Sequence, residues 1–98
     1  MRDIAAERSE IDRAIEGQTL CSVFAATAAR LGDAEALACK GPDGQWRSWS
    51  WRDYREQVRD AALGFHALGV APRSFGVIMA RNRPEYAIAD LGLVHAGA

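Results

Sequence analysis

The sequence predicts an α/β protein. Residues 75–80 form an apolar run of strand length that carries no charge. Segments with helical patterning precede and follow this run, and a strand buried on both faces belongs in a sheet that helices cover. The expected order of elements is helix, helix, hairpin, helix, strand, helix, with no internal repeat and no low-complexity linker.

Composition limits the class of protein. The 98 residues, 49% of them hydrophobic and 26% charged, suit one small domain or a piece of a larger one. The net charge of −1 gives no electrostatic reason to expect nucleic acid as a partner. No apolar stretch reaches the roughly 18–20 residues of a transmembrane segment, and the N-terminus is too acidic for a signal peptide. Cys21 and Cys39 lack Cys-x-x-Cys spacing, which predicts reduced thiols and a cytoplasmic location.

Two helices are expected at the N-terminus. Residues 2–17 are rich in Glu, Arg and Ala, with three isoleucines at near-helical spacing, so residues 1–17 are predicted as a charged, loosely attached helix. Thr19 is a suitable N-cap for the next helix, whose apolar face contains Leu20, Phe24, Ala28 and Leu31. Gly32 stands at its C-cap position. Residues 18–98 are predicted as the second unit.

A hairpin and a third helix follow. Residues 36–39 and 46–49 flank the turn sequence Gly-Pro-Asp-Gly, which predicts two antiparallel strands. Ser50 is expected to cap the next helix, with Trp49 placed to pack against Tyr54. The buried stripe of this helix is predicted to contain Tyr54, Val58, Ala61, Ala62, Phe65 and Leu68. Gly69 and Val70 match a Schellman ending.

The last third predicts a strand, a capped turn and a buried helix. Asn82 is expected to act as the N-cap, with Pro84 in the first turn and Glu85 reaching back toward the cap. From Tyr86 to Ala96 the only charged side chain is Asp90. A helix this apolar around its circumference is expected to be buried, with Asp90 meeting a backbone donor or a basic side chain.

Three groups of residues invite a functional interpretation, and each has a simpler structural one. Trp46, Trp49 and Trp51 could stack on bases or sugars, but packing in the core is the favoured interpretation. His66 and His95 have no acidic or thiol partner at metal-ligand spacing, so His95 is predicted to be a hydrogen-bonded core histidine; a catalytic histidine completed by residues elsewhere stays open.

The third group is Arg81, Asn82 and Arg83, which could attract an anion at a helix start. The favoured interpretation is a cap with two solvated cations, because the Asn82 side chain would occupy the N–H groups that an anion needs. No Gly-x-Gly-x-x-Gly or Walker-type loop occurs, and no Ser/His/Asp set can be argued. We therefore predict no catalytic, cofactor-binding or metal-binding residue in this sequence.

Five stretches resemble the adenylate-forming AMP-dependent synthetases, and among them the bacterial long-chain fatty acid–CoA ligases. They are Thr19–Phe24, Trp49–Tyr54, Ala67–Val70, Met79–Tyr86 and Ile88–Ala98. In this family they correspond to an opening helix, the entry and exit of the next helix, a strand with an Asn-x-Pro-Glu-like turn, and a helix that ends in Ala-Gly-Ala. One departure stands out: Arg73-Ser74 follows Pro72 where the family usually has Gly-Asp, and Gly76 lies within the predicted strand.

The resemblance implies the incomplete first part of the large N-terminal domain of an adenylate-forming enzyme, ending before its nucleotide-binding motifs. Full-length relatives convert a fatty acid, ATP and CoA into acyl-CoA, AMP and diphosphate, with Mg²⁺. The phosphate loop, adenine contacts, acyl tunnel and catalytic lysine of the family all lie downstream of the matching segment. No functional residue or cofactor is therefore carried over, and the chain is expected to be inactive alone.

An alternative comes from the strand at residues 75–80. Without its neighbours this strand would expose hydrogen-bonding groups along its edge, a known route to association. The alternative function is a non-catalytic interaction module, or a remnant, that pairs this open edge with a partner or with itself. A self-contained nucleotide-binding domain is a third interpretation, which the missing phosphate-binding loop disfavours.

Overall fold

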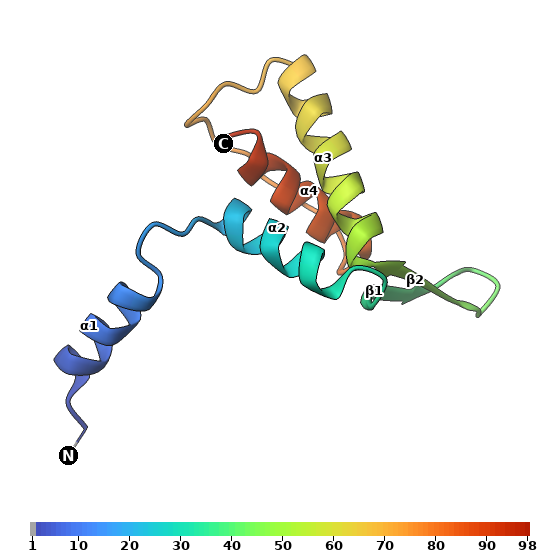
Figure 1. The fold of residues 1–98 in the computed structure, drawn as a ribbon. Coiled ribbons are helices and arrows are strands. Elements are labelled where there is room, and N and C mark those ends of the chain that lie inside the picture. The colour runs from blue at the N-terminus through green and yellow to red at the C-terminus, as the bar shows by residue number, and fades with distance from the viewer. Residues whose placement is uncertain (1) are drawn as a thin grey trace.

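The computed structural model describes residues 2–98, and its helices and strands follow the predicted order with one exception (Figure 1). Within this range the mixed α/β fold class is confirmed. The elements are α1 (Ile4–Ala14), α2 (Leu20–Leu31), β1 (Glu35–Lys40), β2 (Trp46–Ser50), α3 (Trp51–Ala67) and α4 (Pro84–His95). Helices α2, α3 and α4 pack together beside the hairpin, whereas α1 projects away from them.

Short polar side chains cap the first three helices, and two of these caps, Thr19 and Ser50, were predicted. Thr19 accepts a hydrogen bond from the Ser22 N–H (3.0 Å), and the Ser22 hydroxyl accepts one from the Thr19 N–H (2.9 Å). Ser50 accepts a bond from the Asp53 N–H at 3.0 Å, as predicted for α3. Asp3 caps α1 through a 3.1 Å bond from the Ala6 N–H. Local chemistry therefore fixes where these helices begin.

Helix α3 ends in the predicted Schellman motif. The Gly69 N–H donates to the His66 carbonyl and the Val70 N–H donates to the Phe65 carbonyl, both at 3.0 Å. Leu68, which was predicted in the buried stripe, is instead exposed. The stripe ends early because α4 packs along only part of the length of α3.

The hairpin has the predicted antiparallel pairing, with Leu37 opposite Trp49 and Cys39 opposite Arg47. Trp46 was expected in the core but is exposed, and the Lys40 ammonium lies 5.8 Å from its ring centroid. The pair Lys40–Trp46 lies next to the turn, beyond the reach of the helices. Trp46 therefore lies beside the Lys40 ammonium and is not part of the core.

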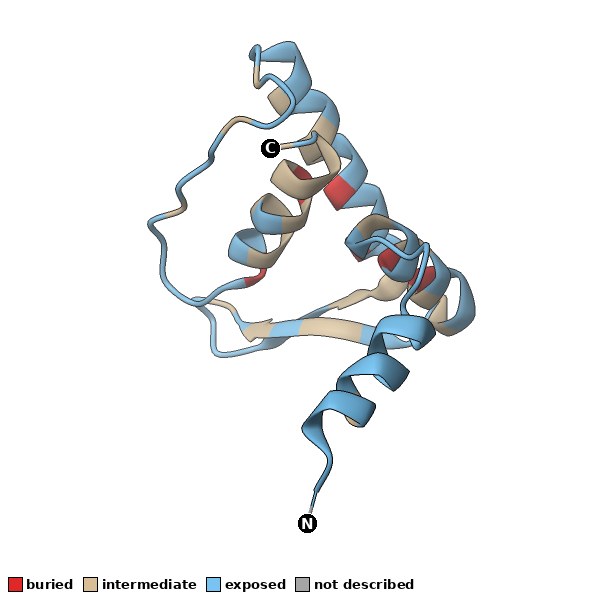
Figure 2. Ribbon diagram, turned by 90° about the vertical axis from the view of Figure 1, so that its left-hand side faces the viewer, coloured by how far each residue is buried: buried red, intermediate tan, exposed pale blue. Residues whose placement is uncertain are grey.

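The core is a small aromatic cluster between α2 and α3. Phe24, Tyr54 and Val58 are buried, and Phe24 meets Tyr54 edge-on with 4.9 Å between ring centroids. Trp51 is half-buried at 5.9 Å from the ring of Tyr54 and 6.4 Å from that of Phe24, as its predicted core role requires. Within residues 2–98, all buried positions lie on α2, α3 and α4 (Figure 2).

The predicted strand at residues 75–80 is wrong for this structure. The segment is extended, but none of its N–H or C=O groups has a main-chain hydrogen-bond partner within residues 2–98. Phe75, Val77 and Met79 are 98%, 86% and 93% exposed. A strand requires a neighbouring strand, and the part of the chain that the structure describes provides none here.

The opposite side of this segment packs on α4. A Cβ added to Gly76 would lie 2.5 Å from Leu93 Cδ1, so the glycine allows the chain to lie directly on the helix. Glycine is unfavourable inside a strand, but here Gly76 allows the close packing of this segment on α4. Gly92 is buried in the same way against α3, where an added Cβ would lie 2.8 Å from the Ala61 Cβ.

The predicted start of α4 also requires correction. Arg83, not Asn82, is the N-cap, and no side chain caps this helix. Pro84 occupies the first turn as predicted, but the Glu85 carboxylate accepts a 2.7 Å bond from Arg83 Nε instead of reaching back toward Asn82. A residue before proline is restricted to extended backbone, so Arg83 cannot join the helix and the helix starts at Pro84.

Helix α4 is half-buried and not buried on all sides. Only Pro84 and Gly92 are fully buried, because α3 covers one face of the helix and the extended segment around Gly76 covers only part of another. Asp90 lies on the side of α4 that borders the extended segment, but it is exposed and has no ion-pair partner in residues 2–98, so water solvates it and no buried donor is needed. None of the described helices is long and apolar enough to cross a membrane.

Candidate functional site

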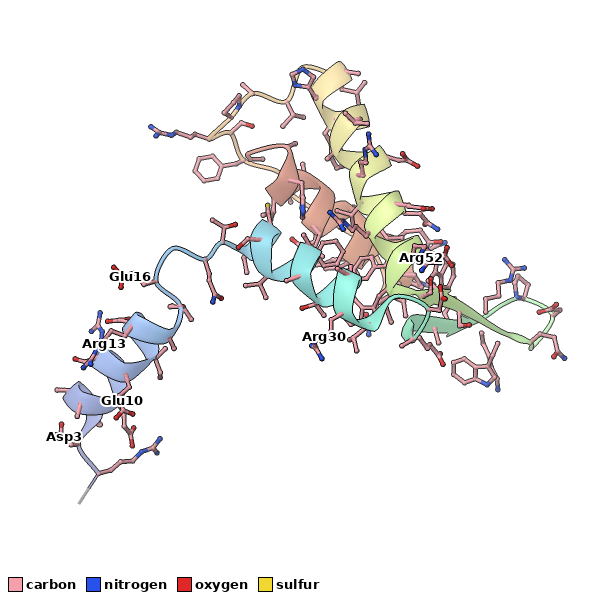
Figure 3. All side chains as sticks on the ribbon, in the orientation of Figure 1. Asp3, Glu10, Arg13, Glu16, Arg30 and Arg52 are labelled. Atoms are coloured by element: carbon pink, nitrogen blue, oxygen red, sulfur yellow. The ribbon has the colours of Figure 1, made fainter. Side chains whose placement is uncertain are left out.

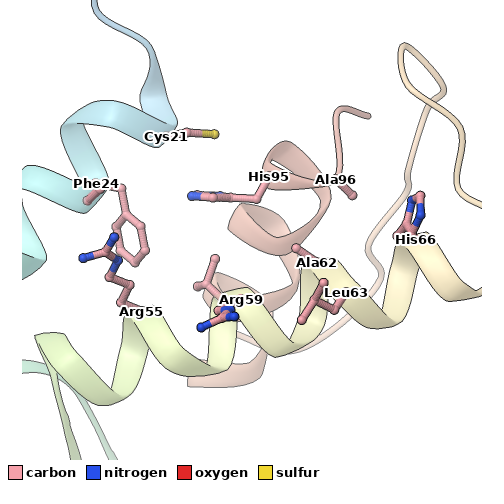
Figure 4. Close-up of a pocket in the computed structure, with 11 residues that line it drawn as sticks. Cys21, Phe24, Arg55, Arg59, Ala62, Leu63, His66, His95 and Ala96 are labelled. Carbon is pink, nitrogen blue, oxygen red and sulfur yellow. The ribbon is translucent and has the colours of Figure 1, made fainter.

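A groove of about 430 Å³ lies between α2, α3 and α4 (Figure 4). It is called the helix groove below. Its lining residues are Cys21, Phe24, Ala25, Arg55, Val58, Arg59, Ala62, Leu63, His66, His95 and Ala96.

Helical periodicity brings these residues to one place. On α2, Cys21, Phe24 and Ala25 have the spacing of a single helix face. On α3, Arg55, Arg59, Ala62 and His66 share another face at intervals of four, three and four residues. The second pattern is visible in the sequence, but Arg55 and Arg59 are also what a solvated helix surface contains, so the groove could not be predicted from it.

His95 is the most constrained polar side chain of the groove. Its Nδ1 lies 2.7 Å from the Leu91 carbonyl oxygen, and since a carbonyl only accepts, Nδ1 carries the proton. Its ring meets Phe24 edge-on at 5.6 Å. His95 is therefore hydrogen-bonded and packed, as predicted, although it is half-buried and its Nε2 is left as the acceptor of the neutral ring.

The charged side chains that line the helix groove are all basic. Arg55 and Arg59 project from α3 at its rim, and His66 stands at the end of the groove (Figure 4). No carboxylate is among the lining residues, and the floor is made of apolar side chains. Across residues 2–98 no three His, Cys, Asp or Glu side chains gather as a metal site would require. The groove is suited to binding an apolar surface that carries negative charge.

A second concave surface lies between the hairpin and the start of α4. The sequence suggested Arg81 and Arg83 as possible anion ligands, and the fold adds Lys40 and Arg47 from the hairpin. Glu85 offsets part of this charge: its bond with Arg83 lowers the pKa of Glu85 and raises the pKa of Arg83. Both side chains are exposed, so their ion pair contributes little to stability.

Arg52, which follows the third tryptophan, forms an ion pair with Asp33 at 2.8 Å. The prediction that this chain holds no catalytic, cofactor-binding or metal-binding residue stays a prediction.

Comparison with known proteins gives the family. The model of the AMP-binding enzyme family matches residues 24–98, which includes most of α2, the hairpin, α3 and α4. The chain belongs to the AMP-binding enzyme family. The match begins within α2, so α1 lies outside it.

The relatives of this chain include proteins named as ligases. An uncharacterized protein of Mycobacterium tuberculosis strain H37Rv is 35% identical over 98% of the chain and 53% of its own length. The long-chain-fatty-acid–CoA ligase ACSBG2 of Xenopus laevis is 44% identical over 81% of the chain and 11% of its own length. The Drosophila melanogaster ligase heimdall is 33% identical over 94% of the chain and 14% of its own length.

The chain thus spans about half the length of its mycobacterial relative and about a tenth of the two ligases. No solved structure gives a significant match.

Proposed function

We propose that residues 18–98 form the first part of the large domain of a long-chain fatty acid–CoA ligase, and that residues 1–17 are a helix appended to it. In this role the segment is scaffold. The observation that carries the proposal is the combination of a family match over residues 24–98 with ligase relatives that align along most of the chain.

The scaffold role agrees with what the segment does in the structure. Its apolar side chains hold α2, α3 and α4 together, while Phe75, Val77 and Met79 offer an extended apolar face to a neighbour. A strand needs at least one neighbouring strand to pair its main-chain groups. We infer that other parts of a ligase supply those neighbours, together with the groups that bind ATP, Mg²⁺, CoA and the fatty acid.

A chimera tests this role. The 80 residues of the Xenopus ligase that align with this chain are replaced by the aligned residues of this chain, and activation of a long-chain fatty acid is measured. Retained CoA ligase activity is expected, because the two segments are 44% identical and a core tolerates hydrophobic substitutions that keep its volume and patterning. A matched chimera that also carries Phe24→Ala should lose the folded enzyme. A folded but inactive first chimera would contradict the scaffold role.

We further propose that the 98-residue chain alone does not activate fatty acids. The measurement is ATP–diphosphate exchange with a long-chain fatty acid and Mg²⁺, with an intact ligase as the positive control. Exchange above the level of a no-enzyme blank would overturn this proposal and leave the chimera result untouched.

A second candidate function is a non-catalytic interaction module. It is supported by the unpaired main chain of residues 75–80 and their exposed apolar side chains. The partner would add a strand to this edge. Val77→Lys should weaken such pairing, because charges on an edge strand oppose it. A partner that binds the Val77→Lys variant as tightly as the parent chain would exclude this mode.

A further inference from the structure

Two arginines at the rim of the helix groove have no counter-charge. Arg55 and Arg59 stand one helical turn apart on α3, and both line the groove. Like charges four residues apart on a helix repel each other. Neither arginine belongs to any of the four ion pairs found in residues 2–98. An anion between the two guanidinium groups would therefore relieve a repulsion that the described chain leaves in place.

The carboxylates of the neighbouring elements lie elsewhere. Helix α2, which forms the opposite wall of the groove, contains no acidic residue. On α4, Asp90 is on the side that borders the extended segment. Figure 3 shows Asp3, Glu10 and Glu16 on the part of the chain that projects away from the three packed helices. None of these groups offsets the charge at the groove.

The carboxylates closest to the two arginines in sequence are Glu56 and Asp60 on α3 itself. Each follows an arginine by one residue, which turns it about 100° around the helix axis. Glu56 also precedes Arg59 by three residues, but the two form no ion pair. Neither carboxylate lines the groove, so its positive charge faces the ligand space without compensation.

The size and the floor of the groove select a small elongated ligand. Its volume of about 430 Å³ is within the range of about 300–1,000 Å³ that small-molecule sites have. An α-helix about 10 Å wide that rises 1.5 Å per residue fills roughly 120 Å³ per residue, so this space would hold only about four residues of one. Apolar side chains, among them Ala62 and Leu63, line the groove between Arg55 and His66, which are about 16 Å apart along α3. A single aliphatic chain suits this space better than a peptide helix does.

We propose that the helix groove binds a single-chain anionic amphiphile. Its carboxylate or phosphate head lies between Arg55 and Arg59, because guanidinium groups bind the oxygens of both heads through paired hydrogen bonds. Its aliphatic chain lies along Ala62 and Leu63 toward His66. The proposal rests on the groove alone, and its failure would leave the proposed ligase role untouched.

Isothermal titration calorimetry of the full chain with monomeric dodecanoate tests the ligand class. Acetate has the head without the chain, and dodecyltrimethylammonium has the chain with the opposite charge. Both are expected to bind at least about ten-fold more weakly than dodecanoate, because each lacks one of the two contacts. Dodecyl phosphate is titrated in parallel, and the tighter of the two anions identifies the preferred head. Equal binding of dodecyltrimethylammonium and dodecanoate would overturn the proposal. Binding to phosphatidylglycerol vesicles without binding to either monomeric anion would also overturn it, because the basic rim would then serve a bilayer surface.

Paired variants test the role of the arginines. Arg55→Gln/Arg59→Gln should weaken dodecanoate binding by about ten-fold or more. Both positions are exposed and glutamine is a good helix former, so the fold is retained. Arg47→Gln/Arg81→Gln is the matched control, since it removes the same charge from exposed positions outside the groove, and it should leave the affinity unchanged. Equal losses in the two double variants would mean non-specific attraction and would overturn the proposal.

The two cysteines locate the ligand without any substitution. Both are free and half-buried, but Cys21 lines the helix groove (Figure 4) and Cys39 lies outside it. Alkylation by iodoacetamide is followed at each cysteine by peptide mass spectrometry, with and without saturating dodecanoate. The ligand should slow the alkylation of Cys21 several-fold and leave that of Cys39 unchanged. An unchanged rate at Cys21 would place the amphiphile elsewhere and overturn the proposal.

Discussion

Two phenylalanines of this molecule differ sharply in how far they are buried. Phe24 is 8% exposed in an aromatic cluster between helices, whereas Phe75 is 98% exposed at the start of an extended segment. Around Phe24, the ends of α2 and α3 are fixed by caps within a few residues, so that the cluster forms from elements that are already defined. From Phe75 to Ala80 the main chain has no main-chain hydrogen-bond partner in residues 2–98. The comparison shows that helices carry their own hydrogen bonds, whereas a strand depends on a neighbour.

The largest effect on stability should come from truncating Phe24, and the same truncation at Phe75 is its control. Phe24→Ala is expected to cost about 3–5 kcal/mol of unfolding free energy, which is enough to unfold a domain of this size. Phe75→Ala should change stability by less than about 0.5 kcal/mol, because its ring packs on nothing. Urea denaturation followed by circular dichroism measures both. Equal losses at the two positions would remove the contrast between the regions.

The contact between α3 and α4 provides the next test. Gly92→Ala places a Cβ 2.8 Å from that of Ala61, so we expect the helices to separate at a cost of about 1–3 kcal/mol. Gly64→Ala is the matched control in the interior of α3, where nothing lies within 4 Å, and it should stabilise the chain by about 0.5–1 kcal/mol. Thermal unfolding of both variants would show opposite shifts; a destabilised Gly64→Ala chain would contradict this assignment.

The turn that leads into the extended segment holds a strained residue. Arg73 has a φ of 62°, in the left-handed region where glycine is favoured. Arg73→Gly should stabilise the chain by about 1 kcal/mol, because it removes the Cβ clash of that conformation, partly offset by the greater entropy of unfolded glycine. Arg73→Ala keeps the strain and serves as the control. If both variants have the same midpoint of unfolding, the strain is absent.

Helix caps give the smallest expected effects. Ser50→Ala should cost about 1 kcal/mol, because it removes the acceptor of the Asp53 N–H. Asn82→Ala should cost less than about 0.5 kcal/mol, since Asn82 caps no helix in this structure. Chemical denaturation of the two variants under identical conditions checks this pair. A larger loss for Asn82→Ala would restore the sequence-based prediction for the start of α4.

Most features that depend on residues close together in the sequence were predicted correctly, and most features that depend on distant residues were not. Thr19 and Ser50 act within three residues, and the Schellman bonds at Gly69 and Val70 span one helical turn, so local chemistry is enough to predict them. The start of α4 was misassigned because Asn82 and Arg83 both precede Pro84 at plausible cap positions. The restriction that proline places on the residue before it decided the outcome.

The errors at residues 75–80, Trp46 and Leu68 have a common cause. Each assumed that an apolar side chain would find a partner, and the partner was not a property of the local sequence. The helix groove was missed for a related reason. Its arginines and its apolar floor come from three helices, and only the fold shows that Arg55 and Arg59 border the same concavity as Cys21 and His95.

Amide hydrogen exchange at a concentration where the chain is monomeric tests the contrast between the two regions most directly. The amides of α3 around Tyr54 and Val58 should exchange slowly, because their N–H groups are bonded within a helix that packs on the aromatic cluster. The amides of residues 75–80 should exchange at close to the rate of an unstructured peptide. Protection of residues 75–80 comparable to that of α3 would contradict the account, because it would mean that this segment already has the neighbour that we find missing.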